Sequence, residues 1–276
     1  MANILRIFLL PILLSFLASC SNIFEPTYTE ALWTFSSSFE SSSDFENFYI
    51  VPSGDYDSKH ENSTEMVYSG TYAHKAWIVK ARADNNDGAV YMPHRAYPTV
   101  QFDKTPEGIY RTPCLVTVWV NLDMTLIRRA SGHIDDWFSF VTLTCDASDN
   151  WSRTVLVNIG PTGYIVLMHV PNQGEQEYIY QVSSANDPSS VHIFPQKTWV
   201  RLDVLIDFNA SHGYAKVWQN GILVSHANVK GGKGGLAQAH FGLYASAAVS
   251  SGTIFNDDLR IKEIENENEA LSLLRY

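Results

Sequence analysis

The stretch Leu236–Ile264 reads LAQAHFGLYASAAVSSGTIFNDDLRIKEI and holds two strand-like segments. Side chains alternate across a β-sheet, so the first segment divides its residues between two faces. One face carries apolar residues that a core can bury: Ala239, Phe241, Leu243 and Ala245. The opposite face carries polar and small residues: Gln238, His240, Gly242, Tyr244 and Ser246. This pattern predicts a sheet with one buried face and one face that presents an imidazole and a phenol on either side of a glycine.

Similar strand-like segments fill the chain before this stretch. They are rich in β-branched and aromatic residues: Cys114–Leu122, Trp137–Thr144, Thr154–Ile159, Tyr164–Val170, Trp199–Phe208 and Tyr214–Gln219. Turn sequences separate them, and Asn220-Gly221 between two alternating segments is the strongest hairpin signal. Many short strands with frequent turns predict an all-β sandwich or barrel. The last residues, Asn266–Tyr276, have helical spacing with Leu271 and Leu274 on one side, which predicts a short terminal helix.

The N-terminus has the pattern of an export signal. Arg6 precedes an apolar run from Ile7 to Leu17, which is shorter than the roughly 20 residues of a membrane-spanning helix. Leu17-Ala18-Ser19-Cys20 then resembles the lipobox of bacterial lipoproteins. The resemblance implies a lipidated Cys20 that anchors the protein to a membrane of the bacterial cell envelope. Ser21 after the cysteine favours the outer membrane or cell surface, and the alternative is an ordinary cleaved signal followed by an unmodified cysteine.

These features divide the chain into four parts. We predict a signal peptide at 1–19, a tether at 20–32, one β-sandwich domain at 33–265 and a C-terminal tail at 266–276. Cys114 and Cys145 fall inside the sandwich, where they either form a disulfide or remain two buried thiols.

The charge of the chain excludes one class of partner. The formal net charge is -10, whereas nucleic-acid binding needs clustered Lys and Arg to displace counterions. We therefore expect no nucleic-acid partner. The acidic balance also disfavours a polyanionic glycan, although a local basic cleft can override the net charge.

The late strands carry a family resemblance. The segment Trp199–His226, WVRLDVLIDFNASHGYAKVWQNGILVSH, is similar to strands of laminin-G-like and concanavalin A-like jelly rolls. QAHFGLYAS resembles the strand that alginate lyases of this fold write as YFKAGxYNQ. Gly242 and Tyr244 match its glycine and second tyrosine, His240 stands at its lysine and Gln238 at its first tyrosine. The resemblance implies a jelly roll of the concanavalin A-like lectin/glucanase superfamily, a sandwich of two antiparallel sheets.

The chain also departs from this pattern. The alginate-lyase pattern has a Gln-x-His strand, and here Leu167 stands where that glutamine would precede His169. The paired glutamates of the retaining glucanases of this fold are absent, so paired-carboxylate glycoside hydrolysis fits poorly. The segment YMPHRAYPT, which contains His94 and Arg95, reads as a loop that either rims a groove or packs as irregular chain.

Two sets of site residues follow for a sugar ligand. A carbohydrate-binding groove on the concave sheet would be lined by six residues: Gln238, His240, Tyr244, His169, Asn158 and Trp151. A polysaccharide lyase would use His240, Tyr244 and His169 as its acid and base, and Gly242 between His240 and Tyr244 would leave room for a sugar. Arg153, with Asn158 or Arg201 as substitutes, would neutralise the carboxylate of a uronate sugar.

The closing strand suggests a cation. IFNDDLRI resembles the last strand of many such jelly rolls, in which an acidic residue helps to hold a structural calcium. Asp257, Asp258 and Glu40 are the expected oxygen ligands, and the alternative is a set of carboxylates that anchor a loop.

The sequence supports three functions. The first expectation is a lipid-anchored protein that binds a polysaccharide. The alternatives are a lyase that cuts a uronate-containing glycan by β-elimination, and a surface lipoprotein that binds a protein partner. A deep groove with an Arg or Gln facing His240 and Tyr244 would favour the lyase, a shallow aromatic platform would favour binding, and a flat apolar face would favour a protein partner.

Overall fold

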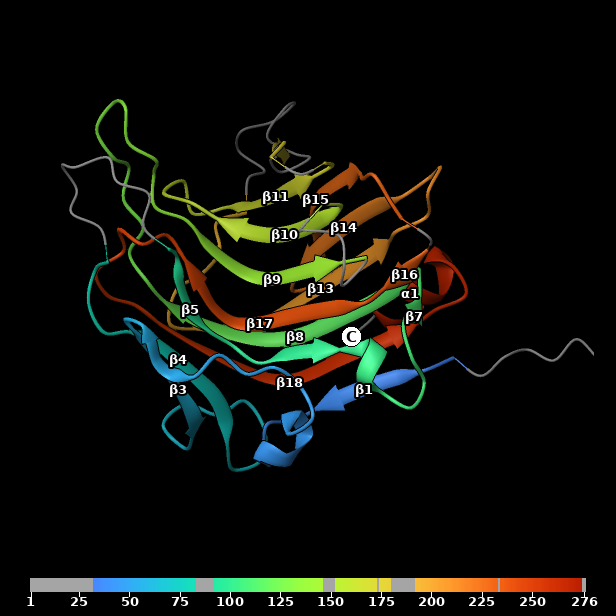
Figure 1. Ribbon diagram of the computed structural model, residues 1–276, viewed down its shortest axis with the longest axis horizontal. Coiled ribbons are helices and arrows are strands. Elements are labelled where there is room, and N and C mark those ends of the chain that lie inside the picture. The colour runs from blue at the N-terminus through green and yellow to red at the C-terminus, as the bar shows by residue number, and fades with distance from the viewer. Residues whose placement is uncertain are drawn as a thin grey trace, which may run out of the picture. The chain divides into compact units, whose positions relative to one another are not determined.

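The computed structural model describes residues 32–82, 92–145, 152–172, 174–179, 192–232 and 234–274. Within them, every strand pair is antiparallel and the strands form two large sheets (Figure 1). No helix in these ranges is long and apolar enough to cross a membrane. The predicted signal peptide, with Cys20 and most of the tether, lies outside the described residues, so export and lipidation stay predictions.

The larger sheet contains eight strands. In spatial order they are β15 (Ile222–Asn228), β14 (Tyr214–Gln219), β13 (Trp199–Asp207), β8 (Cys114–Asp123), β18 (Thr253–Glu263), β4 (Ala73–Ile78) and β3 (Ser58–Ser63), with β1 (Thr34–Ser37) also paired to β18. The predicted Asn220-Gly221 turn joins β14 to β15, and both of its residues have the positive φ that such a two-residue turn requires.

The second sheet contains seven strands. Their order is β12 (Glu177–Ile179), β11 (Ile165–Val170), β10 (Thr154–Ile159), β9 (Phe138–Thr144), β17 (Gln238–Ala245) and β5 (His94–Ala96), with β6 (Thr99–Gln101) also paired to β17. Shorter elements complete the described chain: β2 (Ser53–Tyr56), β7 (Tyr110–Arg111), β16 (Gly235–Leu236), the 3-10 turns Ser42–Phe45 and Phe102–Lys104, and α1 (Glu267–Leu273).

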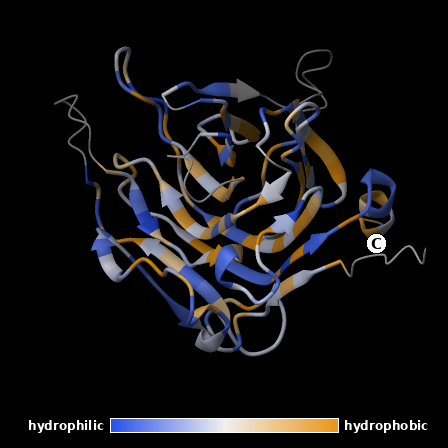
Figure 2. Ribbon diagram, turned by 45° about the vertical axis from the view of Figure 1, so that its right-hand side comes forward, coloured by the Kyte–Doolittle hydropathy of each residue, from blue (hydrophilic) through white to orange (hydrophobic). Residues whose placement is uncertain are grey.

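The core lies between the two large sheets. Alternate residues of β8 turn inward and are fully buried: Val116, Val118, Val120 and Leu122. From the second sheet, Phe241 and Leu243 of β17 join the same cluster, as their alternation predicted. Figure 2 shows that the strands carry most of the hydrophobic positions. Burial of apolar surface stabilises the folded state by about 25 cal/mol per Å², so this shared core is the main source of stability. The predicted all-β sandwich of two antiparallel sheets is confirmed.

The C-terminal helix packs outside this core. Asn266 caps α1 by accepting a hydrogen bond from the Glu269 amide at 3.2 Å. Ala270 and Leu274 are buried in a second cluster on the outer face of the larger sheet. Leu271, expected on the apolar side, is instead 40% exposed. The helical segment is present and Leu274 is buried as predicted, but Ala270 and not Leu271 is its buried neighbour.

The two cysteines of the sandwich do not pair with each other. Both Cys114 and Cys145 are buried, and Cys114 Sγ donates to the Arg111 carbonyl at 3.0 Å. Burial raises the pKa of the Cys114 thiol well above its usual range, so this group stays protonated at neutral pH.

Gly242 marks an irregularity in β17. The register against β9 shifts between Phe241 and Tyr244, and Gly242 has a φ of 118°, a conformation open mainly to glycine. An added Cβ would lie 2.8 Å from the Ala96 carbonyl and 2.8 Å from His74 Cε1. Gly242 therefore packs against neighbouring protein atoms, which corrects the expectation that it leaves room for a sugar.

We expect Gly242→Ala to lower the free energy of unfolding by about 1–3 kcal/mol, because it combines a left-handed backbone with steric overlap. Urea denaturation would measure this. Gly54→Ala is the matched control, since Gly54 has a φ of 105° but no atom within 4 Å of the point where an added Cβ would lie. Equal losses in the two variants would show that backbone strain alone, and not the close packing, accounts for the effect.

Candidate functional site

A cavity of about 270 Å³ opens on the face of the second sheet that points away from the core. Strands β5, β9, β10, β11 and β17 supply most of its walls. The lining residues are Arg95, Tyr97, Thr142, Thr154, Leu156, Met168, Val170, Gly174, Gln176, His240 and Tyr244.

Strand register explains why these residues meet. Residues directly opposite each other on paired strands place their side chains on the same face. Tyr244 of β17 is opposite Arg95 of β5, and His240 is opposite Thr142 of β9. Thr142 is in turn opposite Leu156 of β10. The paired strands β5, β17, β9 and β10 therefore place both polar and apolar side chains in the lining of one cavity.

Aromatic rings hold the two predicted residues together. The Tyr97 ring stacks on His240 with a centroid distance of 4.8 Å and an interplanar angle of 18°. The same ring meets Tyr244 edge-on at 6.1 Å, and Trp137 meets Tyr244 edge-on at 5.0 Å. Tyr97 therefore spans the interval between His240 and Tyr244 and limits the motion of both.

Arg95 supplies the positive charge among the lining residues. Its guanidinium carbon lies 5.8 Å from the centre of the Tyr244 ring. Its Nε atom is buried and has no hydrogen-bond partner within the described part of the chain. A buried donor without a partner is costly, so this atom is an unsatisfied group at the edge of the cavity.

Burial separates the proton affinities of His240 and Tyr244. Desolvation lowers the pKa of His240 to about 4, and the charge of Arg95 acts in the same direction. Desolvation raises the pKa of Tyr244, while the charge of Arg95 and a hydrogen bond from it partly oppose that rise. At neutral pH the imidazole is therefore neutral and can accept a proton, whereas the phenol is protonated and can donate one.

Two of the other residues predicted to bind a sugar, Gln238 and Asn158, are absent from the lining of this cavity. Gln238 shares the polar face of β17 but does not line the cavity. Asn158 shares the face of β10 that carries Leu156, is buried, and has an Oδ1 atom without a partner among the described residues. Trp151 lies outside the described residues.

Two predicted arginines lie elsewhere. Arg153 does not line the cavity, and its guanidinium carbon is 3.9 Å from the position of a Cβ on Gly232. Arg201 is on β13 of the larger sheet, where its guanidinium pairs with Asp203 at 2.9 Å. Neither residue lines the cavity beside His240, whereas Arg95 does.

His169 points to the other side of the sheet. It is opposite Val155, a core residue, whereas Met168 and Val170 line the cavity. Its Nδ1 lies 3.1 Å from the Thr154 carbonyl, and its Nε2 accepts the Lys230 amide at 2.8 Å. The expectation that His169 joins His240 at the site is wrong, because the alternation of β11 turns it inward.

The predicted calcium ligands meet one loop. Asp257 Oδ2 accepts the amides of Tyr68 and Ser69 at 2.9 and 3.1 Å, and Glu40 Oε1 accepts the amides of Thr71 and Tyr72 at 2.7 and 3.0 Å. Asp258 Oδ1 accepts the Ser69 hydroxyl at 3.0 Å. Within the described ranges no group of three or more His, Cys, Asp or Glu is arranged around a common metal position. These carboxylates anchor the loop, and calcium stays a prediction.

A second cavity of about 530 Å³ lies beside this loop. Its polar lining includes Glu40, Glu61, His60 and His74, and none of its lining residues is Lys or Arg. His74 is buried, and desolvation lowers its pKa to about 3, so it is neutral. An acidic lining does not suit a uronate, and we therefore assign the candidate sugar site to the smaller cavity.

Comparisons with known proteins agree with the fold. No protein-family model and no curated protein matches the chain. Among solved structures, the cellulose-induced protein Cip1 aligns over 82% of this chain and 95% of its own, with a TM-score of 0.56 and 14% identity. An endo-β-1,4-glucuronan lyase from the fungus Trichoderma reesei aligns over 79% and 92%, with a TM-score of 0.48 and 11% identity. The chain has the concanavalin A-like jelly-roll fold.

Proposed function

We propose that the chain binds a uronate-containing polysaccharide in the Arg95 cavity and cleaves it by β-elimination. The observation that supports this most directly is Arg95, which faces both His240 and Tyr244. A cavity with an arginine beside an imidazole and a phenol favours a lyase over a simple aromatic platform. The described residues do not form a flat apolar face here, so a protein partner has less support.

The reaction needs three groups. A base removes the proton from the carbon next to the uronate carboxylate, and the electron pair forms a carbon–carbon double bond. The bond to the leaving glycosidic oxygen breaks, and an acid protonates that oxygen. A cation stabilises the negative charge that develops on the carboxylate in the transition state. No co-reactant is required.

The cavity offers one residue for each role. Neutral His240 is the proposed base, because burial keeps its pKa near 4 and leaves it unprotonated. Tyr244 is the proposed acid, because its raised pKa keeps the phenol protonated. Arg95 is the proposed partner of the carboxylate. Leu156, Met168 and Val170 would contact the apolar C–H face of a sugar ring.

Binding without cleavage is the second candidate. Its specific support is the burial of His240, which is only 7% exposed and has one ring face covered by Tyr97. A shielded imidazole can orient a sugar hydroxyl while remaining a poor base.

Ultraviolet absorbance distinguishes cleavage from binding alone, because the unsaturated uronate product absorbs and the intact polymer does not. The protein is incubated with a panel of polyuronates and neutral glycans. Absorbance that rises with a polyuronate supports the lyase. Binding without a rise supports the second candidate, and neither binding nor a rise would contradict both.

We also propose the predicted lipid anchor at Cys20 in a bacterial cell envelope. Cys20→Ser should abolish acylation and release the protein from membrane fractions. Mass spectrometry of the mature N-terminus measures the acyl groups directly, and an unmodified Cys20 in the wild-type protein would contradict the proposal.

Calcium at the Asp257 loop is a further proposal that thermal unfolding can test. Carboxylate oxygens are the ligands that this hard cation prefers, and Asp257, Asp258 and Glu40 reach the same segment. We expect calcium at a hundredfold excess over its Kd to stabilise the fold by about 2.7 kcal/mol, and a chelator to reverse this. Asp257→Asn should lose the effect, whereas Asp123→Asn, at an exposed ion pair, should keep it. No calcium response in the wild type would show that the carboxylates only anchor the loop.

A further inference from the structure

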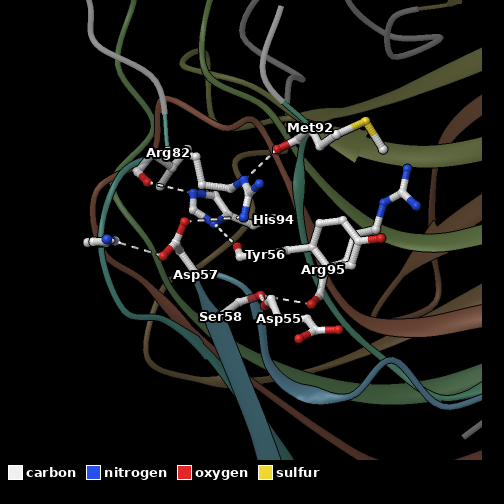
Figure 3. A network of polar contacts seen from close by, with 10 residues as sticks. Asp55, Tyr56, Asp57, Ser58, Arg82, Met92, His94 and Arg95 are labelled. Atoms are coloured by element: carbon white, nitrogen blue, oxygen red, sulfur yellow. Dashed lines mark hydrogen bonds and ion pairs between the residues drawn. The ribbon is translucent and has the colours of Figure 1, made fainter.

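The turn between β2 and β3 lies against Arg95, one of the residues that line the cavity. Tyr56 and Asp57 form this turn, and both have a positive φ, 54° and 52°. Figure 3 shows the Tyr56 ring beside Arg95. The guanidinium carbon of Arg95 lies 5.2 Å from the centre of the Tyr56 ring. Since the same carbon lies 5.8 Å from the Tyr244 ring, Arg95 contacts an aromatic residue from each of two separate segments.

Several contacts hold the turn in this position (Figure 3). The His94 ring nitrogens lie 3.0 Å from the Tyr56 carbonyl and 2.9 Å from the Val249 carbonyl. The Ser58 hydroxyl donates to the Arg95 carbonyl at 2.8 Å. The turn is therefore tied to β5 through the His94 side chain and through the backbone carbonyl of Arg95.

A second arginine also contacts the Tyr56 ring. Arg82 has its guanidinium carbon 5.4 Å from the Tyr56 ring centre. Its charge is balanced by Asp57 at 3.2 Å, and its Nε donates to the Met92 carbonyl at 2.8 Å. Arg82 therefore interacts with both residues of the turn, whereas Arg95 Nε has no hydrogen-bond partner in the described part of the chain.

From this arrangement we infer that Tyr56 is a positioning residue that fixes Arg95 for a planar carboxylate. The inference rests on the proposed function. A guanidinium is planar and donates its hydrogen bonds from its edge, in a fork that matches a carboxylate. Aromatic contacts restrict its rotation, and the donors of its edge that are not bonded to Tyr244 would serve the ligand. Tyr56 would in this way set a preference for uronate over neutral sugars at the cavity.

Replacement of Tyr56 with asparagine tests the ring without disturbing the turn, because asparagine tolerates the left-handed conformation. The ligands are the uronate oligosaccharide that the wild type binds most tightly in the panel and its carboxyl-reduced, neutral form. We expect Tyr56→Asn to weaken binding of the uronate form about tenfold and to leave the neutral form unchanged. Tyr56→Phe, which keeps the ring, is the matched control and should bind as the wild type does.

A double-mutant cycle separates positioning from a general structural effect. In an Arg95→Ala background, Tyr56→Asn should cause no further loss, because the ring acts through Arg95. An equal loss for the charged and neutral ligands, or additive losses in the cycle, would overturn the inference while leaving the proposed function intact. A wild type that binds no uronate ligand would overturn both.

Discussion

Arg95→Ala is expected to lower kcat/KM for a uronate polysaccharide by about 10²–10³-fold, the size of effect seen when a transition-state charge partner is removed. Arg95 carries the positive charge in the lining of the cavity, and its Nε is buried without a described partner. Without it, the enolate-like charge on the carboxylate would develop beside lining residues none of which is Lys or Arg. Initial rates from product absorbance measure the loss.

Two variants sharpen this expectation. Arg95→Lys keeps the charge but loses the planar fork, so we expect it to recover only part of the rate. Arg111→Ala is the control for loss of a cation, since that side chain is 55% exposed and lies next to Glu263 away from the cavity. Wild-type kcat/KM in Arg95→Ala would refute the role proposed for this residue.

Much of the fold is predictable because the strands are long and strongly patterned. The two strand-like segments of Leu236–Ile264 are β17 and β18, one in each large sheet. Alternation is clear in β17, so its buried and polar faces follow directly from the sequence. The irregularity at Gly242 is not visible in this pattern, because it depends on contacts with Ala96 and His74 from other strands.

Less of the site is predictable, and for two physical reasons. Strand β11, IVLMHV, is apolar on both faces, so alternation cannot tell which face holds His169. The three-residue strand β5 is too short to show any period, so Arg95 reads as part of an irregular loop. Its position opposite Tyr244 is a property of strand pairing, and no local signal in the sequence reports it.

Tyr244→Phe is expected to reduce kcat by about 10²–10⁴-fold, the usual contribution of a positioned acid or base, with little change in KM. Phenylalanine keeps the contacts with Tyr97 and Trp137, which lie 6.1 and 5.0 Å from the Tyr244 ring, and removes only the hydroxyl. His240→Asn should give a comparable loss, because it removes the proposed base. Tyr72→Phe and His212→Asn, both exposed residues outside this cavity, are the controls.

The pH dependence assigns the two roles. Burial lowers the pKa of His240 to about 4, so a His240 base should stay active well below the ordinary histidine pKa of 6.5 and lose activity only near pH 4. The same shift lowers stability in acid: an unfolded His240 binds a proton below pH 6.5, while the folded one stays neutral until about pH 4, so stability falls across that interval. The raised pKa of Tyr244 should keep the alkaline limit above its ordinary value of 10.0. An acid limit near 6.5 that persists in His240→Asn would show that another residue is the base, whereas an acid limit near 4 that disappears in the weak residual activity of this variant would assign proton removal to His240.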